Sequence, residues 1–261
     1  MNTISLITDF GYKDNFVGVM KAVILKINPK VTIVDLCHEI EPQDVLGASF
    51  LLRGSFGYFP LGTVHLVVVD PGVGSKRKRL LVQTKDYFFI GPDNGVFWFA
   101  LKDETILKII EITNERYFLK PVSDTFEGRD IFAPVAAYVS KGECVEKFGK
   151  ITDSLMPLEF PELKKNNRYL IGEIIHIDNF GNLISNIDKN TFDNFTKDRR
   201  FKIVIEGVVI NKISQGYFEG SSLRPLALFD SFGYLEVAIK NGSAQKLLKV
   251  EKGAKLKVIK T

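Results

Sequence analysis

The sequence has few of the residues that bind metals or form disulfides. Its 261 residues include two cysteines, Cys37 and Cys144, and three histidines, His38, His65 and His176. The cysteines are far apart and match no metal-binding spacing, so we expect a reduced, cytoplasmic protein. The histidines lie in separate segments, which argues against a histidine-based metal site. We therefore expect neither a metal nor a cofactor.

Segments for membrane insertion or secretion are also missing. No apolar run approaches the roughly 20 residues that span a bilayer. The first residues, MNTISLITDFG, have no basic segment ahead of an apolar one and do not read as a signal peptide. A hydrophobic content of 45% with 25% charged residues is typical of a soluble globular protein. The sequence predicts no association with membranes.

Nucleotide and nucleic-acid motifs are incomplete or absent. Gly72-Val73-Gly74 is not followed by the third glycine of a dinucleotide site, and no GxxxxGK[ST] motif occurs. This argues against NAD, FAD and ATP hydrolysis. The net charge of +4 is spread along the chain except for the run Lys76-Arg77-Lys78-Arg79. Such a run can bind nucleic acid but is more often a solvated loop, and no known nucleic-acid-binding motif accompanies it. We expect no nucleic-acid partner.

The sequence does contain alternating strands and helices in its first half. Buried strands are predicted at 3–8, 31–36 and 63–69. Between them come an amphipathic helix beginning near Asp14, which can cap it, and a second amphipathic segment at 44–57. This alternation predicts a Rossmann-like, mostly parallel sheet with helices on both faces. Segments 80–83 and 87–90 are then expected to form a hairpin.

The second half of the sequence has a different pattern. Residues 156–167 carry two prolines and the run LysLysAsnAsn, which predicts an interdomain linker between an α/β domain at 1–155 and a second domain at 168–261. Short strands predominate in this second domain, and they predict a small all-β barrel. We expect strands at 169–177, 201–210, 224–229, 233–239 and 254–260, with helical residues only around 189–195 and 242–248.

Polar turns follow several of the predicted strands. Strand 63–69 ends at Asp70-Pro71-Gly72, which places the Asp70 carboxylate where open α/β sheets bind ligands. Arg77 follows seven residues later and could fold back toward it. The alternative is an ordinary β-turn with a solvated basic tip. Asp93 suits the N-cap of a short helix, and the Arg129-Asp130 pair could be capping charges of another.

These motifs, in this order, resemble the S-adenosyl-L-methionine (SAM) hydroxide adenosyltransferases, the SAM hydrolases that form adenosine and are related to fluorinating and chlorinating enzymes. The matching segments cover both halves of the chain: Thr8-Asp9-Phe10-Gly11, Val69–Gly74, Gly91–Gly95, Thr125-Phe126, Gly128-Arg129-Asp130, Asp178–Asn182 and Gly233–Glu236. The resemblance implies an α/β domain followed by a β-barrel. It also implies a homotrimer whose active sites lie between the first domain of one subunit and the second domain of a neighbour.

The implied reaction is hydrolysis of SAM to adenosine and L-methionine. The sulfonium makes the C5′ carbon electrophilic, so the site need only orient and activate a water molecule. In the family an Asp-Arg-His set does this. Asp70 and Arg77 match the first two, but Glu127 stands where most relatives have histidine. A carboxylate there could hold Arg77 or accept the proton itself, or it could leave two acids repelling one another.

The resemblance also assigns substrate contacts. Asp9 would bind the ribose hydroxyls, and Asn182 the adenine edge. Phe126, Phe180 and Tyr217 would enclose the adenine or ribose. The remaining residues would bind the methionine end or border the substrate; they are Asp14, Asp178, Ser231, Gly128 and Glu236.

Two other functions stay open at this stage. In the halogenases an uncharged residue replaces Asp70, and the fluorinating branch has serine where this chain has Gly128. A carboxylate would repel an incoming halide, which disfavours halide transfer. The other alternative, motivated by Glu127, is a non-catalytic protein that binds adenosine or SAM.

Overall fold

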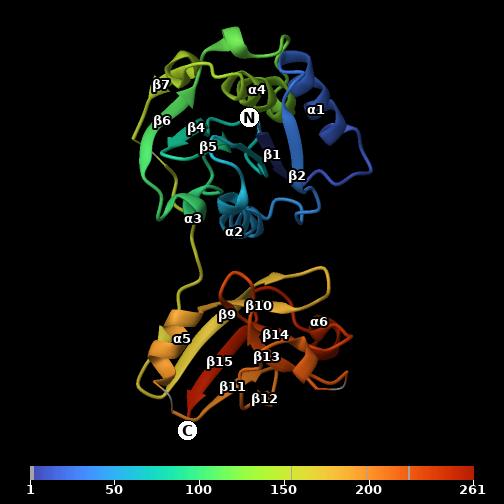
Figure 1. Ribbon diagram of the computed structural model, residues 1–261, viewed down its shortest axis with the longest axis vertical. Helices are drawn as coiled ribbons and strands as arrows, with labels where there is room; N and C mark the ends of the chain where they lie inside the picture. Colours follow the sequence, from blue (N-terminus) through green and yellow to red (C-terminus); the bar gives the residue numbers. More distant parts are fainter. Residues whose placement is uncertain (1–2, 154, 198, 223) are drawn as a thin grey trace. The chain divides into compact units, whose positions relative to one another are not determined.

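A computed structural model describes residues 3–153, 155–197, 199–222 and 224–261. The chain divides into two compact units, Met1–Glu159 and Phe160–Thr261 (Figure 1). Within the described residues, no helix combines the length and the apolar character that crossing a bilayer would require.

A seven-stranded sheet forms the centre of the first unit, in the order β2-β1-β3-β5-β4-β6-β7. Its strands are β1 (Thr3–Thr8), β2 (Thr32–Cys37), β3 (Val64–Val68), β4 (Arg79–Thr84), β5 (Phe88–Pro92), β6 (Ile106–Ile112) and β7 (Gly149–Ile151). Strands β2, β1, β3 and β5 are parallel, whereas β4, β6 and β7 pair antiparallel with their neighbours. The sheet is therefore mixed rather than mostly parallel. The predicted hairpin is the reason, because it enters the sheet with β5 beside β3 and β4 running backward.

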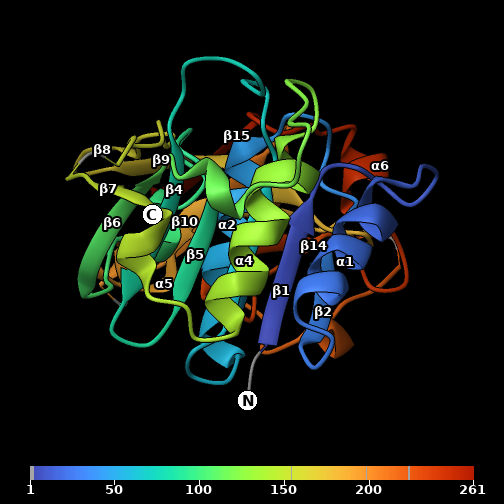
Figure 2. The same cartoon turned by 90° about the horizontal axis from the view of Figure 1, so that it is seen from above.

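Helices cover both faces of this sheet, as predicted. Figures 1 and 2 show α1 (Phe16–Ile27) and α4 (Ala133–Ser140) on one face and α2 (Val45–Ser55) and α3 (Trp98–Leu101) on the other. Shorter helical turns are η1 (Phe56–Tyr58), η2 (Glu115–Tyr117), η3 (Gly128–Phe132) and η4 (Val145–Phe148). The segment η3 is a π-helical turn that leads directly into α4.

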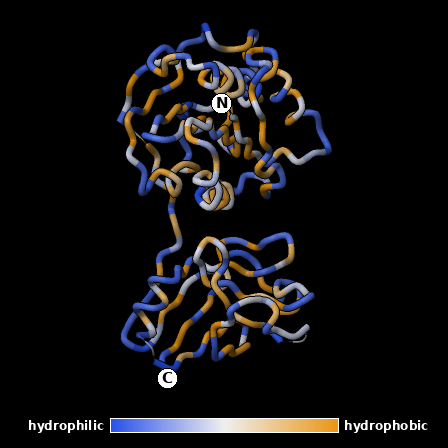
Figure 3. The backbone as a smooth tube through the Cα atoms, in the orientation of Figure 1, coloured by the Kyte–Doolittle hydropathy of each residue, from blue (hydrophilic) through white to orange (hydrophobic). Residues whose placement is uncertain are grey.

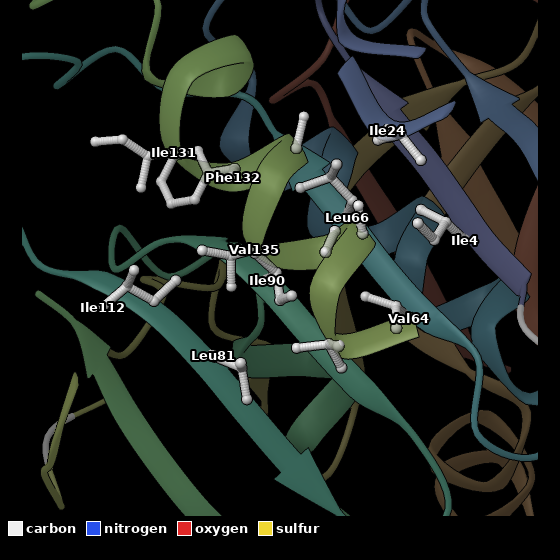
Figure 4. Packing of buried hydrophobic residues seen from close by; sticks show 14 of the residues in the cluster. Ile4, Ile24, Val64, Leu66, Leu81, Ile90, Ile112, Ile131, Phe132 and Val135 are labelled. Atoms are coloured by element: carbon white, nitrogen blue, oxygen red, sulfur yellow. The ribbon is translucent and has the colours of Figure 1, made fainter. Parts of the chain in front are cut away.

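The alternation of side chains along the central strands builds two cores. Ile4, Leu66 and Val135 belong to the core beneath α1 and α4 (Figure 4). Ile7 and Val67, which are odd-numbered neighbours on β1 and β3, belong to the core beneath α2 and α3. Each of these side chains is fully buried, which stabilises the fold by about 1.5–3 kcal/mol per residue. The central strands are thus held from both sides.

Two predicted helix caps are wrong. Helix α1 begins at Phe16 after Asn15, and no side chain caps it, so Asp14 lies in the preceding turn. Helix α3 follows Phe97, while the Asp93 carboxylate instead accepts a hydrogen bond from the Met156 backbone at 2.7 Å. In both cases a local signal for a cap is overridden by a turn or by a contact distant in sequence.

The second unit is a nearly closed, barrel-like antiparallel sheet. Its main order is β12-β11-β15-β9-β10-β14-β13, with β8 beside β9. The strands are β8 (Lys164–Lys165), β9 (Tyr169–Ile177), β10 (Leu183–Asp188), β11 (Phe201–Ile205), β12 (Val208–Ile210), β13 (Leu226–Phe229), β14 (Tyr234–Ala238) and β15 (Lys255–Lys260). Helices α5 (Lys189–Thr196) and α6 (Ala244–Leu248) and the turn η5 (Tyr217–Glu219) complete the unit. Figure 3 shows the hydrophobic stretches of its strands between hydrophilic loops.

Two strand predictions in this unit need correction. The segment 201–210 is a hairpin, because Glu206 and Gly207 both have positive φ (44° and 76°) and turn the chain back. The sequence pattern does not predict strand β10, although it lies in the middle of the sheet between β9 and β14.

Candidate active site

The loop from Val69 to Lys78 connects the end of β3 to β4. The Val69 carbonyl accepts a hydrogen bond from the Asn94 side chain at 2.8 Å, and the Asp70 carboxylate accepts one from the Gly72 backbone at 3.2 Å. At Gly74 the loop has φ +74°, and a Cβ there would lie 2.4 Å from the Asp124 carbonyl oxygen. A glycine is therefore needed where this loop packs against the segment that leads to Glu127.

Arg77 folds back onto Asp70. Its Nε donates hydrogen bonds to the two oxygens of the Asp70 carboxylate at 3.0 and 2.9 Å, and its Nη2 also contacts that carboxylate. The guanidinium lies 5.5 Å from the centre of the Phe132 ring. Only 8% of the Arg77 side chain and 4% of the Asp70 side chain are exposed. The pair is buried, so Arg77 is not part of a solvated basic tip.

Glu127 binds two arginines. Its Oε2 accepts a hydrogen bond from Nη2 of Arg77, and its Oε1 accepts bonds from Nε of Arg79, at 3.0 Å, and from Nη2 of Arg79. The Glu127 side chain is 2% exposed and that of Arg79 31%. Arg79 was not anticipated as a site residue. The signal in the sequence is its distance of two residues from Arg77, because side chains two apart in an extended chain point to the same side.

The charges in this cluster stabilise one another. Burial raises the pKa of Glu127, but hydrogen bonds and charge from Arg79 and Arg77 outweigh it and lower the pKa below its usual range. Burial lowers the pKa of Arg77, but Asp70 and Glu127 together raise it above its ordinary value. Glu127 and Arg77 are thus both held in their charged forms. The Nη1 of Arg77 is buried and hydrogen-bonds to no side chain among the described residues.

The other predicted residues of the first unit come from three separate segments of the chain. Asp9 follows β1, and its carboxylate accepts a hydrogen bond from the Gln43 backbone at 2.9 Å. Asp14 is exposed in the turn before α1. The Phe126 ring packs edge-on against Phe10 and Phe16, with ring centres 5.8 and 5.2 Å away. Phe10 and Phe16 therefore hold Phe126, the residue that precedes Glu127, in an aromatic cluster.

Gly128 allows η3 to approach the end of β3 closely. A Cβ at this position would lie 3.3 Å from a methyl group of Val68 and 3.4 Å from the sulfur of Met20. A larger residue would push η3 away from the sheet. Gly128 thus sets the place from which Glu127 reaches Arg77.

Two of the histidines have structural partners in the sheet. The Nδ1 of His38 lies 2.8 Å from the hydroxyl of Thr8, and the His38 carbonyl accepts a bond from the Gly11 backbone at 2.7 Å. His65 lies 2.7 Å from the Ser5 hydroxyl, and burial lowers its pKa to about 3. His38 therefore fastens the turn that carries Asp9. Among the described residues, no His, Cys, Asp and Glu side chains gather in a group of three or more that could hold a metal ion.

The predicted residues of the second unit form a separate group. Asp178 organises a tight turn, because its carboxylate accepts bonds from the Phe180 backbone at 2.9 Å and from the Asn182 backbone and side chain at 2.8 Å each. Gly181 in this turn has φ +81°. The side chain of Phe180 is 75% exposed.

This turn borders a cavity of about 640 Å³. Its lining includes Asp178, Phe180, Asn182 and Tyr217, together with Phe218 and residues 239–243. The Tyr217 hydroxyl donates a hydrogen bond to the buried Glu236 carboxylate at 2.9 Å. Ser231 lies exposed in the turn between β13 and β14 and is not part of this lining.

Burial raises the pKa of Glu236 to about 7, and the charges of Asp178 and Asp230 add to this effect while the Tyr217 hydrogen bond opposes it. Glu236 is therefore a buried acid rather than a surface residue of β14. The structure thus brings together Asp70, Arg77 and Glu127 in the first unit, and Asp178, Phe180, Asn182 and Tyr217 around the cavity of the second.

Comparison with known proteins gives a consistent family. The family model described as the SAM hydroxide adenosyltransferase N-terminal domain matches residues 4–149, and the model of the C-terminal domain matches residues 172–257. A protein of Methanocaldococcus jannaschii named (R)-S-adenosyl-L-methionine hydrolase is 37% identical over 96% of this chain and 93% of its own length. A fluorinase of Nocardia brasiliensis is 25% identical over 90% of this chain and 89% of its own.

A solved structure has the same fold as this chain. The crystal structure of an uncharacterized conserved protein from Thermotoga maritima is 37% identical to this chain. It superimposes with a TM-score of 0.89, covering 98% of this chain and 100% of that one.

Proposed function

The chain belongs to the SAM hydroxide adenosyltransferase family, and on that premise we propose how its residues hydrolyse S-adenosyl-L-methionine to adenosine and L-methionine. Homologous proteins from M. jannaschii and Thermus thermophilus, which are 37% and 29% identical to this chain, are named (R)-S-adenosyl-L-methionine hydrolase. The observation that supports the assignment of roles is the buried Asp70–Arg77–Glu127 cluster at the end of β3.

The reaction is displacement at C5′ of the substrate. A water oxygen attacks C5′, the C5′–S bond breaks, and its electron pair goes to sulfur, so that methionine leaves as a neutral thioether. The water must lose one proton, and a positioned acid-base group is enough to take it. Because the leaving group is good, holding the water in line with the C5′–S bond supplies most of the remaining catalysis.

We assign these tasks to Asp70 and Arg77. The Asp70 carboxylate takes the proton and releases it to solvent. The Nε and Nη2 atoms of Arg77 donate hydrogen bonds to the carboxylates of Asp70 and Glu127, which leaves Nη1 as the donor for the water oxygen. A guanidinium beside the oxygen favours hydroxide character. Glu127 keeps Arg77 in place, because its Oε2 accepts a hydrogen bond from Nη2 of Arg77 while Arg79 fixes its Oε1.

The substrate would contact both groups of residues. Asp9 suits the two ribose hydroxyls because one carboxylate has two acceptor oxygens. Phe126, Phe180 and Tyr217 offer faces for the adenine or ribose. Asn182 can pair with the adenine edge, while Asp14, Asp178 and Ser231 would bind the amino-acid end. Gly128 and Glu236 would border the bound substrate.

We further propose that the active site is completed by a neighbouring subunit of a homotrimer, as the family resemblance implies. In that assembly the two groups would come from different subunits. Sedimentation should then give a trimer, and a fully active monomer would refute this arrangement. We also propose a cytoplasmic location and the (R)-sulfonium diastereomer as substrate, the latter from the names of the relatives.

Hydrolysis is favoured over the two alternatives. The hydrolases of M. jannaschii and T. thermophilus are 37% and 29% identical to this chain, and the fluorinase of N. brasiliensis is 25% identical. The Asp70 carboxylate on Arg77 would repel a halide. Glu127 is the residue that motivates the alternative of a protein that only binds SAM. Its carboxylate, however, forms an ion pair with Arg77, so Arg77 lies between Glu127 and Asp70 and offsets the repulsion between the two acids.

The test is incubation of the purified protein with each SAM diastereomer in water enriched in oxygen-18. We expect adenosine and methionine in equal amounts, with one heavy oxygen in the 5′-hydroxyl of adenosine. Asp70→Asn should abolish product formation, whereas Asp103→Asn, at an exposed acid of the same unit, should not. Binding of SAM without adenosine release would contradict the proposal.

A further inference from the structure

The side chain that the proposed chemistry leaves unexplained is Arg79. It begins β4, two residues after Arg77, and its side chain is about one-third exposed. Its guanidinium donates to Oε1 of Glu127 through two nitrogens, Nε and Nη2. This fork-like contact fixes the orientation of a carboxylate as well as its charge.

Glu127 would be a costly residue without this second arginine. It is buried beside Arg77, which already binds the carboxylate of Asp70. One arginine would then face two buried acids, and an uncompensated buried charge typically costs several kcal/mol unless the acid takes up a proton. A protonated Glu127 would hold Arg77 more weakly, because hydrogen bonds to a charged acceptor are about twice as strong as neutral ones.

We propose that Arg79 is a positioning residue of the active site, which keeps Glu127 ionised and oriented so that Glu127 in turn holds Arg77 against Asp70. Arg79 contacts neither of the residues assigned to the water, so it acts through Glu127. This inference rests on the proposed hydrolase function. It also makes Glu127 a positioning residue rather than a proton acceptor.

The surroundings of Glu127 support this assignment. The charged groups that face it are Arg77 and Arg79, and Asp70 lies on the other side of Arg77. The next charged residues along the chain, Arg129 and Asp130, bind each other. From η2, Glu115 interacts with Arg79 only through long-range charge. Arg79 is thus the group whose removal changes Glu127 most directly.

The experiment measures kcat and kcat/KM for SAM hydrolysis between pH 3.5 and 8, a range that includes the titration of Glu127 below its ordinary pKa of 4.5. Arg79→Met removes the charge at similar length, so the pKa of Glu127 rises and the acidic limb of kcat should move upward by about one pH unit. Below that limb kcat should fall by about tenfold, with KM nearly unchanged. Arg79→Lys keeps the charge without the fork and should give a smaller shift in the same direction.

The matched control is Arg53→Met, which removes a similarly exposed arginine from its pair with Asp103 in the same unit. Its pH profile should equal that of the wild type. A Glu127→Gln background lacks the carboxylate that Arg79 contacts, so Arg79→Met should cause no additional shift of the limb there. Arg79→Lys covers the case in which Arg79→Met does not fold.

An unchanged pH limb in Arg79→Met, or an equal shift with and without Glu127, would overturn the inference. Either result is distinguishable from failure of the proposed function, since in that case the wild-type protein itself would release no adenosine.

Discussion

The hydroxyl of Tyr217 donates a hydrogen bond to the buried carboxylate of Glu236 at 2.9 Å. Tyr217 lines the cavity of the second unit, while Glu236 lies behind it on β14 with 2% of its surface exposed. The pair therefore links the cavity wall to an acid whose pKa is raised to about 7 by burial and neighbouring acids.

Glu236 should make stability depend on pH near neutrality. Its folded pKa of about 7 exceeds the ordinary value of 4.5, so the folded state favours the protonated acid. This contribution is fully present below about pH 4.5 and is lost as pH rises through about 7, with an upper bound of about 3 kcal/mol. Glutamine does not titrate, so the stability of Glu236→Gln relative to wild type should increase as the pH rises from 5 to 8. Thermal unfolding of both proteins across this range measures the difference.

The control for that measurement is Glu219→Gln, at an exposed acid of the same unit paired with Lys212. The pKa of Glu219 is lowered, chiefly by its bond to Lys212, so its titration lies below the range tested. A Glu236→Gln difference that stays constant between pH 5 and pH 8 would contradict the prediction.

Replacing Arg77 by lysine should reduce kcat by about 100-fold or more. A lysine has one nitrogen, which cannot reproduce the contacts that Nε and Nη2 make with Asp70 and Glu127. The loss compares with that from removing one preorganised donor in other active sites. Steady-state kinetics with adenosine detection would check it, and a lysine variant with wild-type turnover would remove Arg77 from the mechanism.

Replacing Glu127 by histidine should lower turnover, by about tenfold. The carboxylate engages Arg77 through one oxygen and Arg79 through the other, whereas a neutral imidazole has a single acceptor nitrogen. One arginine would be left without its bond. If Glu127 were instead a damaged position in a weakened enzyme, the histidine variant would be faster than wild type.

Gly74→Ala should destabilise the protein and impair activity together. The left-handed backbone disfavours alanine, and the new methyl group would lie 2.4 Å from the Asp124 carbonyl oxygen. We expect a loss of at least about 1–2 kcal/mol of stability and a displaced Asp70 loop. Thermal unfolding and kcat would be measured on the same preparation.

Gly18→Ala provides the opposite case. Gly18 lies inside α1, and a Cβ there would meet nothing within 4 Å. Alanine should raise stability by about 0.5–1 kcal/mol through its helix propensity, with activity unchanged. Equal effects of the two substitutions would show that the contact with Asp124 does not matter.

The layers of the first unit could be predicted from sequence because the buried strands are continuous apolar runs. The reversal of β4 relative to β5 had a local signal in the predicted hairpin. The place of this hairpin in the sheet had no local signal, because nothing in the nearby sequence indicates which of its two strands will pair with β3.

Strand β10 could not be read from sequence because polar residues interrupt its pattern. Ser185 and Asn186 are buried, and their partners lie elsewhere in the chain. The Ser185 hydroxyl binds the Leu235 carbonyl, and the Asn186 amide binds the Pro161 carbonyl and the Glu173 backbone. From sequence alone, two adjacent polar residues indicate a loop. The hydrogen bonds that allow them to be buried in a strand form only in the folded unit.

In the candidate site, the turn chemistry predicted where Asp70 lies, but not what Arg79 does. A run of four basic residues resembles a solvated loop, and only the packing of η3 against β3 brings a buried acid to it. The role of Glu127 was open for the same reason. Its two oxygens acquire separate partners only in the folded unit.

The pairing of two acids with two arginines also bears on how the substrate arrives. Asp70, Glu127, Arg77 and Arg79 sum to no net charge, so an incoming sulfonium cation meets neither long-range attraction nor a barrier from this cluster. This cluster by itself therefore adds little to any dependence of substrate binding on ionic strength. The paired charges of this cluster act on the substrate only at close range, where the individual atoms of Arg77 and Asp70 face it.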